Sequence, residues 1–264
     1  SKISKILTKY KIPTSIQKPF APNIKSANRI VSLYKKTNTQ LMIHENFRWQ
    51  TPLIKLKYLI KKHKLIEPLY SKISFRHSNP VGYTNQTYLY DLKKYLILDV
   101  GIHLYDLSRF YMGEPLSVYT VNQNTNKKFK GETAFTSLIR NKNNSISIIE
   151  ASISSIKKPD RFAQTLVNLE FENGTIDLDY NYKITLHKKN KKITYDARPK
   201  KYKWISKPWD QIQERVINTH KHFIDYLLKN KEHHTSGVDN IKSLSLVFAS
   251  YKSDKLRKEI KLNV

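Results

Sequence analysis

Two short segments of the sequence place charged side chains where they can act on a substrate. The first, Gln17-Lys18-Pro19-Phe20, follows a run typical of a short strand over 12–16 and precedes a predicted helix. Ligands of parallel α/β sheets collect at the carboxyl ends of strands, so we expect Lys18 to face a cleft. Pro19 restricts Lys18 to extended conformations, and a fixed ammonium group can polarise a hydroxyl or a developing alkoxide. The alternative is a solvated lysine in front of a helix-starting proline.

The second segment is Asp99-Val100-Gly101-Ile102-His103, inside a predicted helix over 93–112. The four-residue spacing puts the side chains of Asp99 and His103 on one helical face, one turn apart. A carboxylate there orients an imidazole and raises its basicity, and histidine is the natural general base near neutral pH. Gly101 costs about 1 kcal/mol within a helix, which indicates close approach of another backbone or a ligand. The alternative is an ion-pair ladder that Asp106 and Arg109 continue.

Two further groups of polar residues are of types that can bind a substrate or a metal ion. Asn46 and Arg48 follow a predicted buried strand over 40–44, so we expect them to touch substrate. A helix N-cap at Asn46 and a surface position for Arg48 are the alternatives. The pairs His220/His222 and His233/His234 have no carboxylate or third histidine at suitable spacing, so we expect no metal site.

The elements that must position these residues change character near residue 65. Residues 1–65 alternate in type, which implies a parallel sheet with right-handed crossovers. The predicted order is helix 2–10, strand 12–16, helix 22–37, strand 40–44 and helix 53–63. Two strands are too few for a stable sheet of this kind, so we interpret 1–65 as part of a larger α/β unit.

Residues 66–264 are typical of an open, mainly antiparallel or mixed sheet flanked by helices, an α+β arrangement. The strand-like segments are 70–76, 116–122, 133–140, 145–154, 165–172, 175–179, 184–187 and 193–196, and helices over 210–230 and 238–258 close the chain. Asn173-Gly174 predicts a hairpin turn, because Asn-Gly readily supplies positive φ angles.

Composition narrows the classes of protein. The 264 residues contain no cysteine, which excludes disulfides and thiolate metal sites. No apolar stretch is long enough for a membrane span and no signal peptide begins the sequence, so we expect a cytoplasmic protein. The net charge of +27 points first to nucleic acid. However, only nine of the 48 basic residues are arginine and the lysines are scattered, so we expect solvated lysine-rich faces instead.

Four segments, in order, resemble the signatures of the Gfo/Idh/MocA oxidoreductases. They are Gln17-Lys18-Pro19-Phe20-Ala21, the run 45–50, the run 97–106 with 109–110 and 113–114, and the run 236–240 followed by 246–253. The match covers nearly the whole chain, and the His103 helix is its most specific part. One departure is Gln17, which stands where the family usually has glutamate.

The resemblance implies an NAD(P)-dependent dehydrogenase that acts on a hydroxyl of a sugar or polyol. Lys18, Asp99 and His103 correspond to the family's catalytic residues, and Lys18 and Pro19 to its nicotinamide contacts. Substrate contacts are expected from Asn46, Arg48, Asp99 and His103. Residues 1–65 would be the C-terminal part of a Rossmann-type nucleotide-binding domain, and 66–264 a substrate and dimerisation domain through whose sheet the chain forms a homo-oligomer.

The family's Gly-x-Gly-x-x-Gly turn does not occur among the six glycines, the first of which is Gly82. That turn cradles the cofactor's pyrophosphate. We therefore expect the chain alone to bind NAD or NADP weakly or not at all, and a separate N-terminal Rossmann half to complete it. A catalytically inactive remnant that folds and dimerises, and a basic nucleic-acid-binding protein, remain as alternatives.

Overall fold

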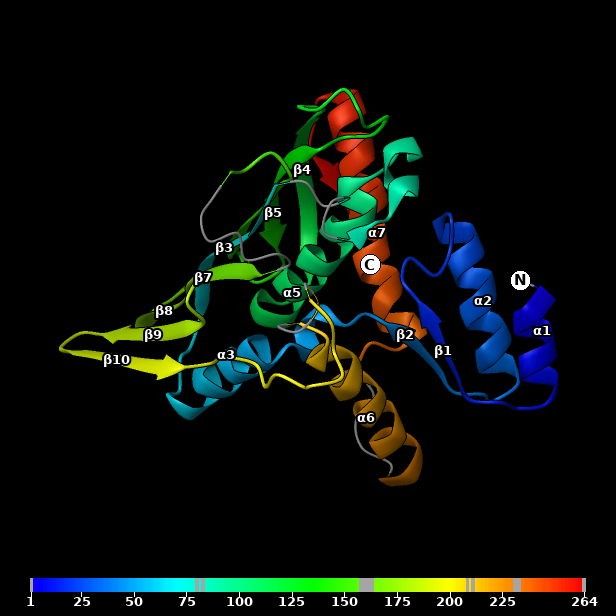
Figure 1. The fold of residues 1–264 in the computed structure, drawn as a ribbon, viewed down its shortest axis with the longest axis horizontal. Coiled ribbons are helices and arrows are strands. Elements are labelled where there is room, and N and C mark those ends of the chain that lie inside the picture. Colours follow the sequence, from blue (N-terminus) through cyan, green and yellow to red (C-terminus); the bar gives the residue numbers. More distant parts are fainter. Residues whose placement is uncertain are drawn as a thin grey trace.

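The architecture is dominated by one large sheet in a computed structural model that describes residues 2–78, 81, 84–156, 164–207, 209, 212–229 and 234–262. Nine strands of the described chain join in the order β10-β9-β8-β7-β3-β6-β5-β4-β11 (Figure 1). Their bounds are β3 Pro68–Arg76, β4 Pro115–Gln123, β5 Ala134–Asn141, β6 Ile146–Ser152, β7 Thr165–Phe171, β8 Gly174–Leu178, β9 Lys183–Lys188, β10 Lys191–Asp196 and β11 Ile260–Lys261. β3 and β6 pair in parallel and the other neighbours are antiparallel, which confirms the mainly antiparallel, mixed sheet.

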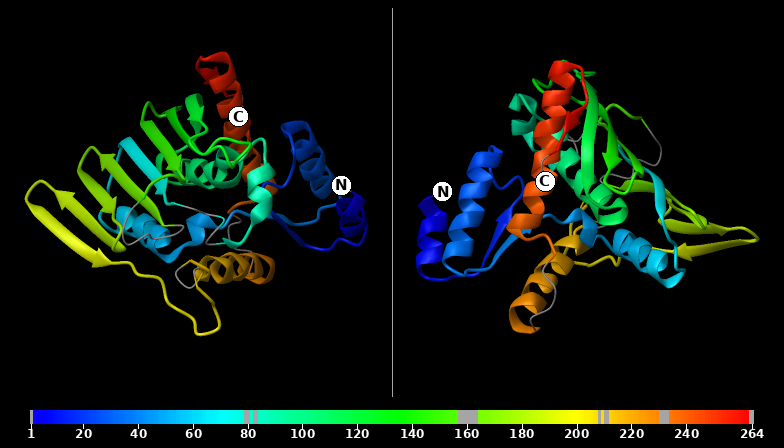
Figure 2. Two further views of the ribbon diagram at one scale, coloured as in Figure 1. Left: turned by 45° about the horizontal axis from the view of Figure 1, so that its top comes forward. Right: turned by 180° about the vertical axis from the view of Figure 1, so that it is seen from behind.

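One face of this sheet is covered by helices. α5 (Ile102–Met112) packs on β3 and β6, and α7 (Gly237–Leu256) packs on β4. Strands alternate accordingly: in β5, Phe135 and Ile139 are buried while Leu138 between them is exposed. The other face keeps apolar side chains exposed, among them Leu116, Tyr119, Val121 and Leu138. Figure 2 shows the strands fanning away from these helices.

The N-terminal elements form a smaller unit at the right of Figure 1. They are α1 (Lys2–Lys9), β1 (Thr14–Gln17), α2 (Ile24–Lys36) and β2 (Leu41–His44). β1 and β2 pair in parallel, as the β-α-β order predicts. The side chain of Asn23 caps α2 by accepting from the Ser26 amide. α2 and β2 also pack on α7, so both halves of the chain share one core.

The predicted helix over 93–112 begins later than its pattern suggests. Its first part, Ile97–Gly101, is a π-helix that runs on into α5. The buried carboxylate of Glu132 accepts hydrogen bonds from the amides of Tyr95, at 3.2 Å, and Ile97, at 2.9 Å. An acceptor placed there satisfies amides that a helix start leaves free, and so fixes the beginning of the helix.

Two glycines serve different purposes from those predicted. A Cβ on Gly101 would lie 3.0 Å from the ring of Phe135, so the close neighbour is a side chain and not a backbone or a ligand. The β7–β8 hairpin at Asn173-Gly174 is present, but neither residue has a positive φ. Gly174 is required because a Cβ there would lie 2.7 Å from the carbonyl oxygen of His187 on the neighbouring strand.

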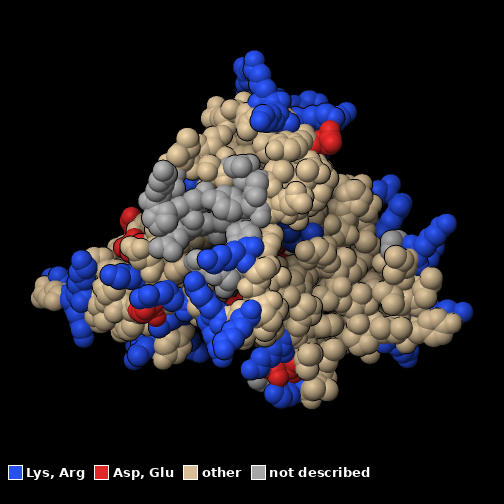
Figure 3. All heavy atoms as spheres, viewed as in Figure 1, with Lys and Arg blue, Asp and Glu red and all other residues tan. Residues whose placement is uncertain are grey.

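Three short elements were not predicted, namely η1 (Phe47–Trp49), η2 (Thr87–Asp91) and β11. α3 (Thr51–Lys62) and α6 (Glu214–Lys229) complete the helices of the described chain. Within the same residues, no helix is long and apolar enough to cross a membrane. Lys and Arg side chains spread over several parts of the face in Figure 3, with few acidic side chains between them.

Candidate active site

A cavity of about 730 Å³ lies where β1 and β2 end, beside the π-helix and beneath the segment that leads into α6. This volume falls within the roughly 300–1,000 Å³ typical of small-molecule sites. The lining includes five of the six residues singled out for chemistry or binding from the sequence: Lys18, Pro19, Asn46, Asp99 and His103. Segments far apart in the chain therefore converge on one place.

Lys18 and Asp99 lie side by side in the cavity wall and are bonded to each other. The Lys18 Nζ donates to Asp99 Oδ1 at 2.8 Å and also to the carbonyl oxygen of Asp99. Lys18 leaves the end of β1 just before a cis peptide bond to Pro19. Burial works against the charge of Asp99, but the Lys18 ammonium outweighs it and lowers the pKa of Asp99. The two groups therefore form an ionised pair.

His103 is held by a carboxylate that the sequence analysis did not assign. Its Nδ1 makes a short contact with Oε1 of Glu45, which is fully buried directly after β2. Asp99 was expected to orient His103. The structure corrects this, because the carboxylate of Asp99 accepts a hydrogen bond from Lys18 instead. The π-helical turn between the two residues also departs from the α-helical phase on which the expectation was based.

Burial shifts the pKa values of His103 and Glu45 towards their neutral forms. Burial lowers the pKa of His103 well below its usual value, and the positive charges of Lys18 and Arg215 lower it further. Burial raises the pKa of Glu45 to about 7, although Lys18 opposes that rise. The imidazole is therefore neutral near neutral pH, which is the form a general base requires.

The ring of Phe47 contacts two of the charged or titratable side chains of the cavity. Phe47 stacks on His103, with ring centroids 3.9 Å apart and planes 2° apart. The guanidinium carbon of Arg215, from α6, lies 4.8 Å from the centroid of the same ring. Burial lowers the pKa of Arg215 to about 10, against the raising effect of the Glu45 and Asp99 charges. Arg215 was also missed from the sequence.

Arg48, which was expected to contact substrate, takes a different place. Its side chain is buried and donates to both carboxylate oxygens of Asp106, at 2.6 and 2.5 Å. It does not belong to the cavity lining in the described chain. Arg109 lies 3.9 Å from Asp106 but reaches Asp239 at 2.6 Å, so the predicted Asp106–Arg109 pair is part of a wider network. Arg48 therefore ties η1 to α5 and α7.

Asn46 does line the cavity and has a free acceptor. Its Nδ2 is 3.5 Å from Nδ1 of His44, while its buried Oδ1 has no hydrogen-bond partner among the described residues. The histidine pairs considered for metal binding lie elsewhere: His222 stacks on Trp49 and accepts from the His234 amide. No group of three metal-binding side chains occurs in the described ranges, and His233 lies outside them.

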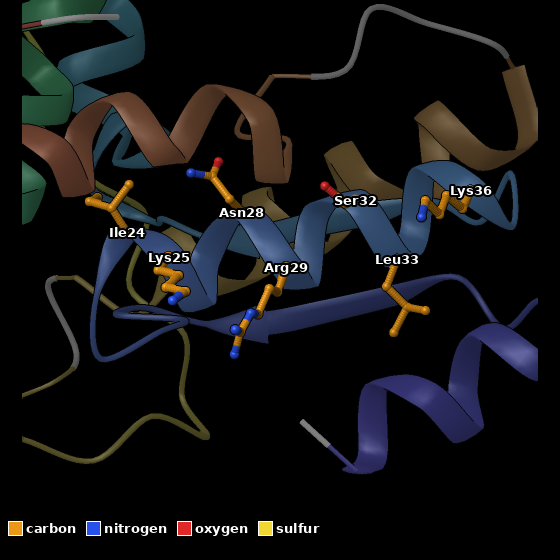
Figure 4. Close-up of a pocket in the computed structure, with 7 residues that line it drawn as sticks. All are labelled: Ile24, Lys25, Asn28, Arg29, Ser32, Leu33 and Lys36. Carbon is orange, nitrogen blue, oxygen red and sulfur yellow. The ribbon is translucent and has the colours of Figure 1, made fainter.

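A second hollow, of about 700 Å³, lies on the exposed side of α2. Figure 4 shows Asn28 and Ser32 pointing to one side of this helix and Lys25, Arg29 and Leu33 to another. All of its lining residues come from the single helix α2. Its lining brings together no acid–base pair, whereas Lys18, Asp99 and His103 all line the first cavity.

Comparison with known proteins places this arrangement in a family. A family model described as the GFO/IDH/MocA C-terminal domain matches residues 53–177. D-apiose dehydrogenase of Rhizobium rhizogenes is 35% identical over 244 residues, which cover 92% of this chain and 70% of that protein. The chain belongs to the Gfo/Idh/MocA family. The assignment to this family that the sequence suggested is thereby confirmed.

Other relatives extend the comparison. D-apiose dehydrogenase of Paraburkholderia graminis is 32% identical, and the match covers 93% of this chain and 65% of that protein. The chain thus spans 70% and 65% of the lengths of the two D-apiose dehydrogenases. An Agrobacterium radiobacter oxidoreductase, solved with NAD⁺, L-tartaric acid and magnesium, is 33% identical with a TM-score of 0.94, over 98% of this chain and 76% of that one.

Proposed function

We propose that this chain carries the substrate-binding and proton-transfer part of a nicotinamide-dependent dehydrogenase that oxidises a hydroxyl of a sugar or polyol. The observation that carries the proposal is the convergence of a neutral, carboxylate-held His103 and the Lys18 ammonium on one cavity. The relationship to two D-apiose dehydrogenases supports this class of substrate.

His103 is the general base. Because Glu45 accepts at Nδ1, that nitrogen carries the proton and Nε2 keeps the lone pair that can take a hydroxyl proton. The lowered pKa keeps the imidazole ready to accept that proton at neutral pH. Glu45 then stabilises the imidazolium as it forms, as a positioned carboxylate does in other acid–base pairs.

Lys18 stabilises the oxygen from which the proton leaves. An ammonium fixed in a shielded cavity lowers the energy of a developing alkoxide. Asp99 keeps Lys18 in place through the 2.8 Å contact and shares the cavity wall with it. Asn46 adds an unused carbonyl oxygen that can accept from a second substrate hydroxyl.

NAD or NADP, when bound, supplies the acceptor for the hydride of the carbinol carbon. The residues present fit the nicotinamide end: Lys18 and Pro19 line a cavity with room for a substrate and a ring. We interpret 1–65 as the C-terminal part of a Rossmann-type domain and 66–264 as the substrate and dimerisation domain. A separate N-terminal Rossmann half would supply the phosphate contacts, since the glycine-rich turn does not occur in these 264 residues.

The remaining cavity wall suits a sugar. Trp204 and Trp209 lie in the lining, and aromatic side chains in such sites cover the apolar faces of a ligand. D-apiose is the substrate we propose to test first. The exposed apolar side chains of the open sheet face, Leu116, Val121 and Leu138 among them, are the surface we assign to a second copy of the chain.

The test is turnover by the completed enzyme. The chain is mixed with, or fused to, the nucleotide-binding half of a D-apiose dehydrogenase, and NADH formation is followed with D-apiose and a series of polyols. We expect turnover that neither half gives alone. Cofactor binding without oxidation of any of these substrates would instead support the inactive remnant.

A further inference from the structure

Arg215 lines the active-site cavity and has hydrogen-bond donors without an acceptor among the described residues. Its Nε and Nη1 are buried and have no hydrogen-bond partner in the part of the chain that the structure describes. Arg48 and Arg109, by contrast, each donate to carboxylates at 3.2 Å or less. A buried donor left without an acceptor costs free energy, and a charged one costs more. A site that keeps such a group is suited to an acceptor that arrives with a ligand.

The two nearby carboxylates do not satisfy this guanidinium. Glu45 and Asp99 act on Arg215 only through their charge, with no hydrogen bond to it among the described residues. Oε1 of Glu45 accepts from His103, while Oε2 is also buried and has no partner among the described residues. Asp99 is engaged by Lys18. Arg215, which lines the cavity, therefore keeps two buried donors without an acceptor among the described residues.

Phe47 fixes where that fork lies. The same ring stacks on His103 at 3.9 Å and contacts the guanidinium carbon of Arg215 at 4.8 Å. Groups bound by Arg215 must then lie beside the hydroxyl whose proton His103 takes. Arginine binds planar pairs of oxygen atoms through two parallel N–H bonds, in which Nη2 donates beside either Nε or Nη1, and lysine cannot do so.

We propose that Arg215 determines the specificity of the site by binding two adjacent oxygen atoms of the substrate, next to the carbon that is oxidised. A vicinal diol of a sugar and the carboxylate of a hydroxy acid both present such a pair. The inference rests on the proposed function, because it assumes that His103 marks the reacting hydroxyl. Its substrate class is narrower than a general polyol: compounds with an isolated hydroxyl are excluded.

The experiment uses Arg215→Met, which keeps an unbranched apolar side chain as far as the ε position but removes every donor. Binding of D-apiose, of its monodeoxy analogues and of D-glycerate to the completed enzyme is measured by calorimetry without turnover. We expect D-apiose to bind about ten- to a hundredfold more weakly, as loss of hydrogen bonds to a charged donor predicts. A monodeoxy analogue that binds worse than D-apiose to the wild type should bind equally to the variant.

Stability separates this role from a structural one. If the guanidinium is kept for a ligand, Arg215→Met removes an unpaired buried charge and the melting temperature of the ligand-free protein rises or stays level. If Arg215 instead holds Glu45 and Asp99, the melting temperature falls and all ligands weaken alike, which overturns the proposal. Arg29→Met, on the exposed side of α2, is the matched control and should change neither quantity.

The arms also separate this proposal from the proposed function. If D-apiose or D-glycerate binds in an Arg215-dependent way but neither is oxidised, the proposed dehydrogenase function is refuted. The proposed binding of two adjacent oxygen atoms by Arg215, the oxygen-pair site, is then supported. Turnover with unchanged affinity and KM in Arg215→Met would remove the oxygen-pair site and leave the dehydrogenase. A larger effect on D-glycerate than on D-apiose identifies the carboxylate as the pair that is recognised.

Discussion

Two clusters of charged and polar residues lie at the two ends of the π-helix and α5, and they differ in how completely their members are paired. At the α5 end, Asp106 is bonded to Arg48, and Arg109 is bonded to Glu114 and Asp239. At the π-helical end, the cavity contains Arg215, Glu45 and Asn46, each with a buried polar atom that has no partner in the described chain. We call the first the paired cluster, and we call the second the open cluster because some of its buried polar atoms have no partner in the described chain.

The difference separates structural from functional charge. Buried charges that are fully paired join elements, and here the paired cluster links η1, α5 and α7. Removing one partner of such a pair is costly because the other charge is stranded. Charged and polar groups left unsatisfied in a cavity destabilise the ligand-free fold, and they are typical of sites that bind or react.

The largest expected effect is on the open cluster. His103→Ala should reduce turnover by about 10²- to 10⁴-fold, because it removes the general base. KM should change much less, since other residues bind the substrate. Steady-state kinetics of the completed enzyme measures both values. Because Ala also removes the ring that stacks on Phe47, His103→Gln and a thermal melt of both variants serve as controls.

An intermediate effect is expected where the open cluster titrates. Glu45 must be ionised to accept from His103, and burial raises its pKa to about 7. The kcat/KM of the wild type should therefore be constant above this pH and fall as the pH drops through it. Glu45→Gln should lose on the order of tenfold at pH 8, the loss of one charge-assisted hydrogen bond, and should lack this acidic limb.

A pH profile of Glu45→Gln that superimposes on that of the wild type would assign the acidic limb to another group. It would also remove Glu45 from its role beside His103. Lys94, which lines the same cavity, offers a control: Lys94→Met changes a charge there without touching the His103–Glu45 contact.

The sequence predicted what is local and periodic. The ends of β1 and β2 follow from short apolar runs, and strand ends in parallel sheets collect ligands. Lys18 and Asn46 were chosen on this ground, and both line the cavity. Glu45 could have been predicted in the same way, because it is an acid directly after a buried strand. The sequence analysis includes it only within the family segment 45–50. The predicted contact between Asp99 and His103 was wrong for two reasons. A π-helical turn lies between them, and Lys18, which is distant in sequence, binds Asp99.

Arg215 left no such signal. It reaches the cavity from the start of α6, far along the chain from Phe47 and Glu45, and only the tertiary fold brings them together. Its neighbours in sequence form an ordinary amphipathic helix. Arg48 shows the reverse error: its place after β2 suggested a ligand contact, but Asp106 and Asp239 bind it in the core.

The most direct test compares Asp99→Asn with Asp106→Asn, the same substitution at the open end and at the paired end. Unfolding free energy and turnover are measured for both. We predict that Asp106→Asn loses about 3–5 kcal/mol of stability because the buried Arg48 loses its main partner and keeps only the 3.4 Å contact with Asp239. Asp99→Asn should lose less stability than Asp106→Asn, since the side chain of Asp99 is 38% exposed and that of Asp106 is fully buried, yet lower turnover at least tenfold. Equal losses of stability, or full activity in Asp99→Asn, would contradict the division between the two clusters.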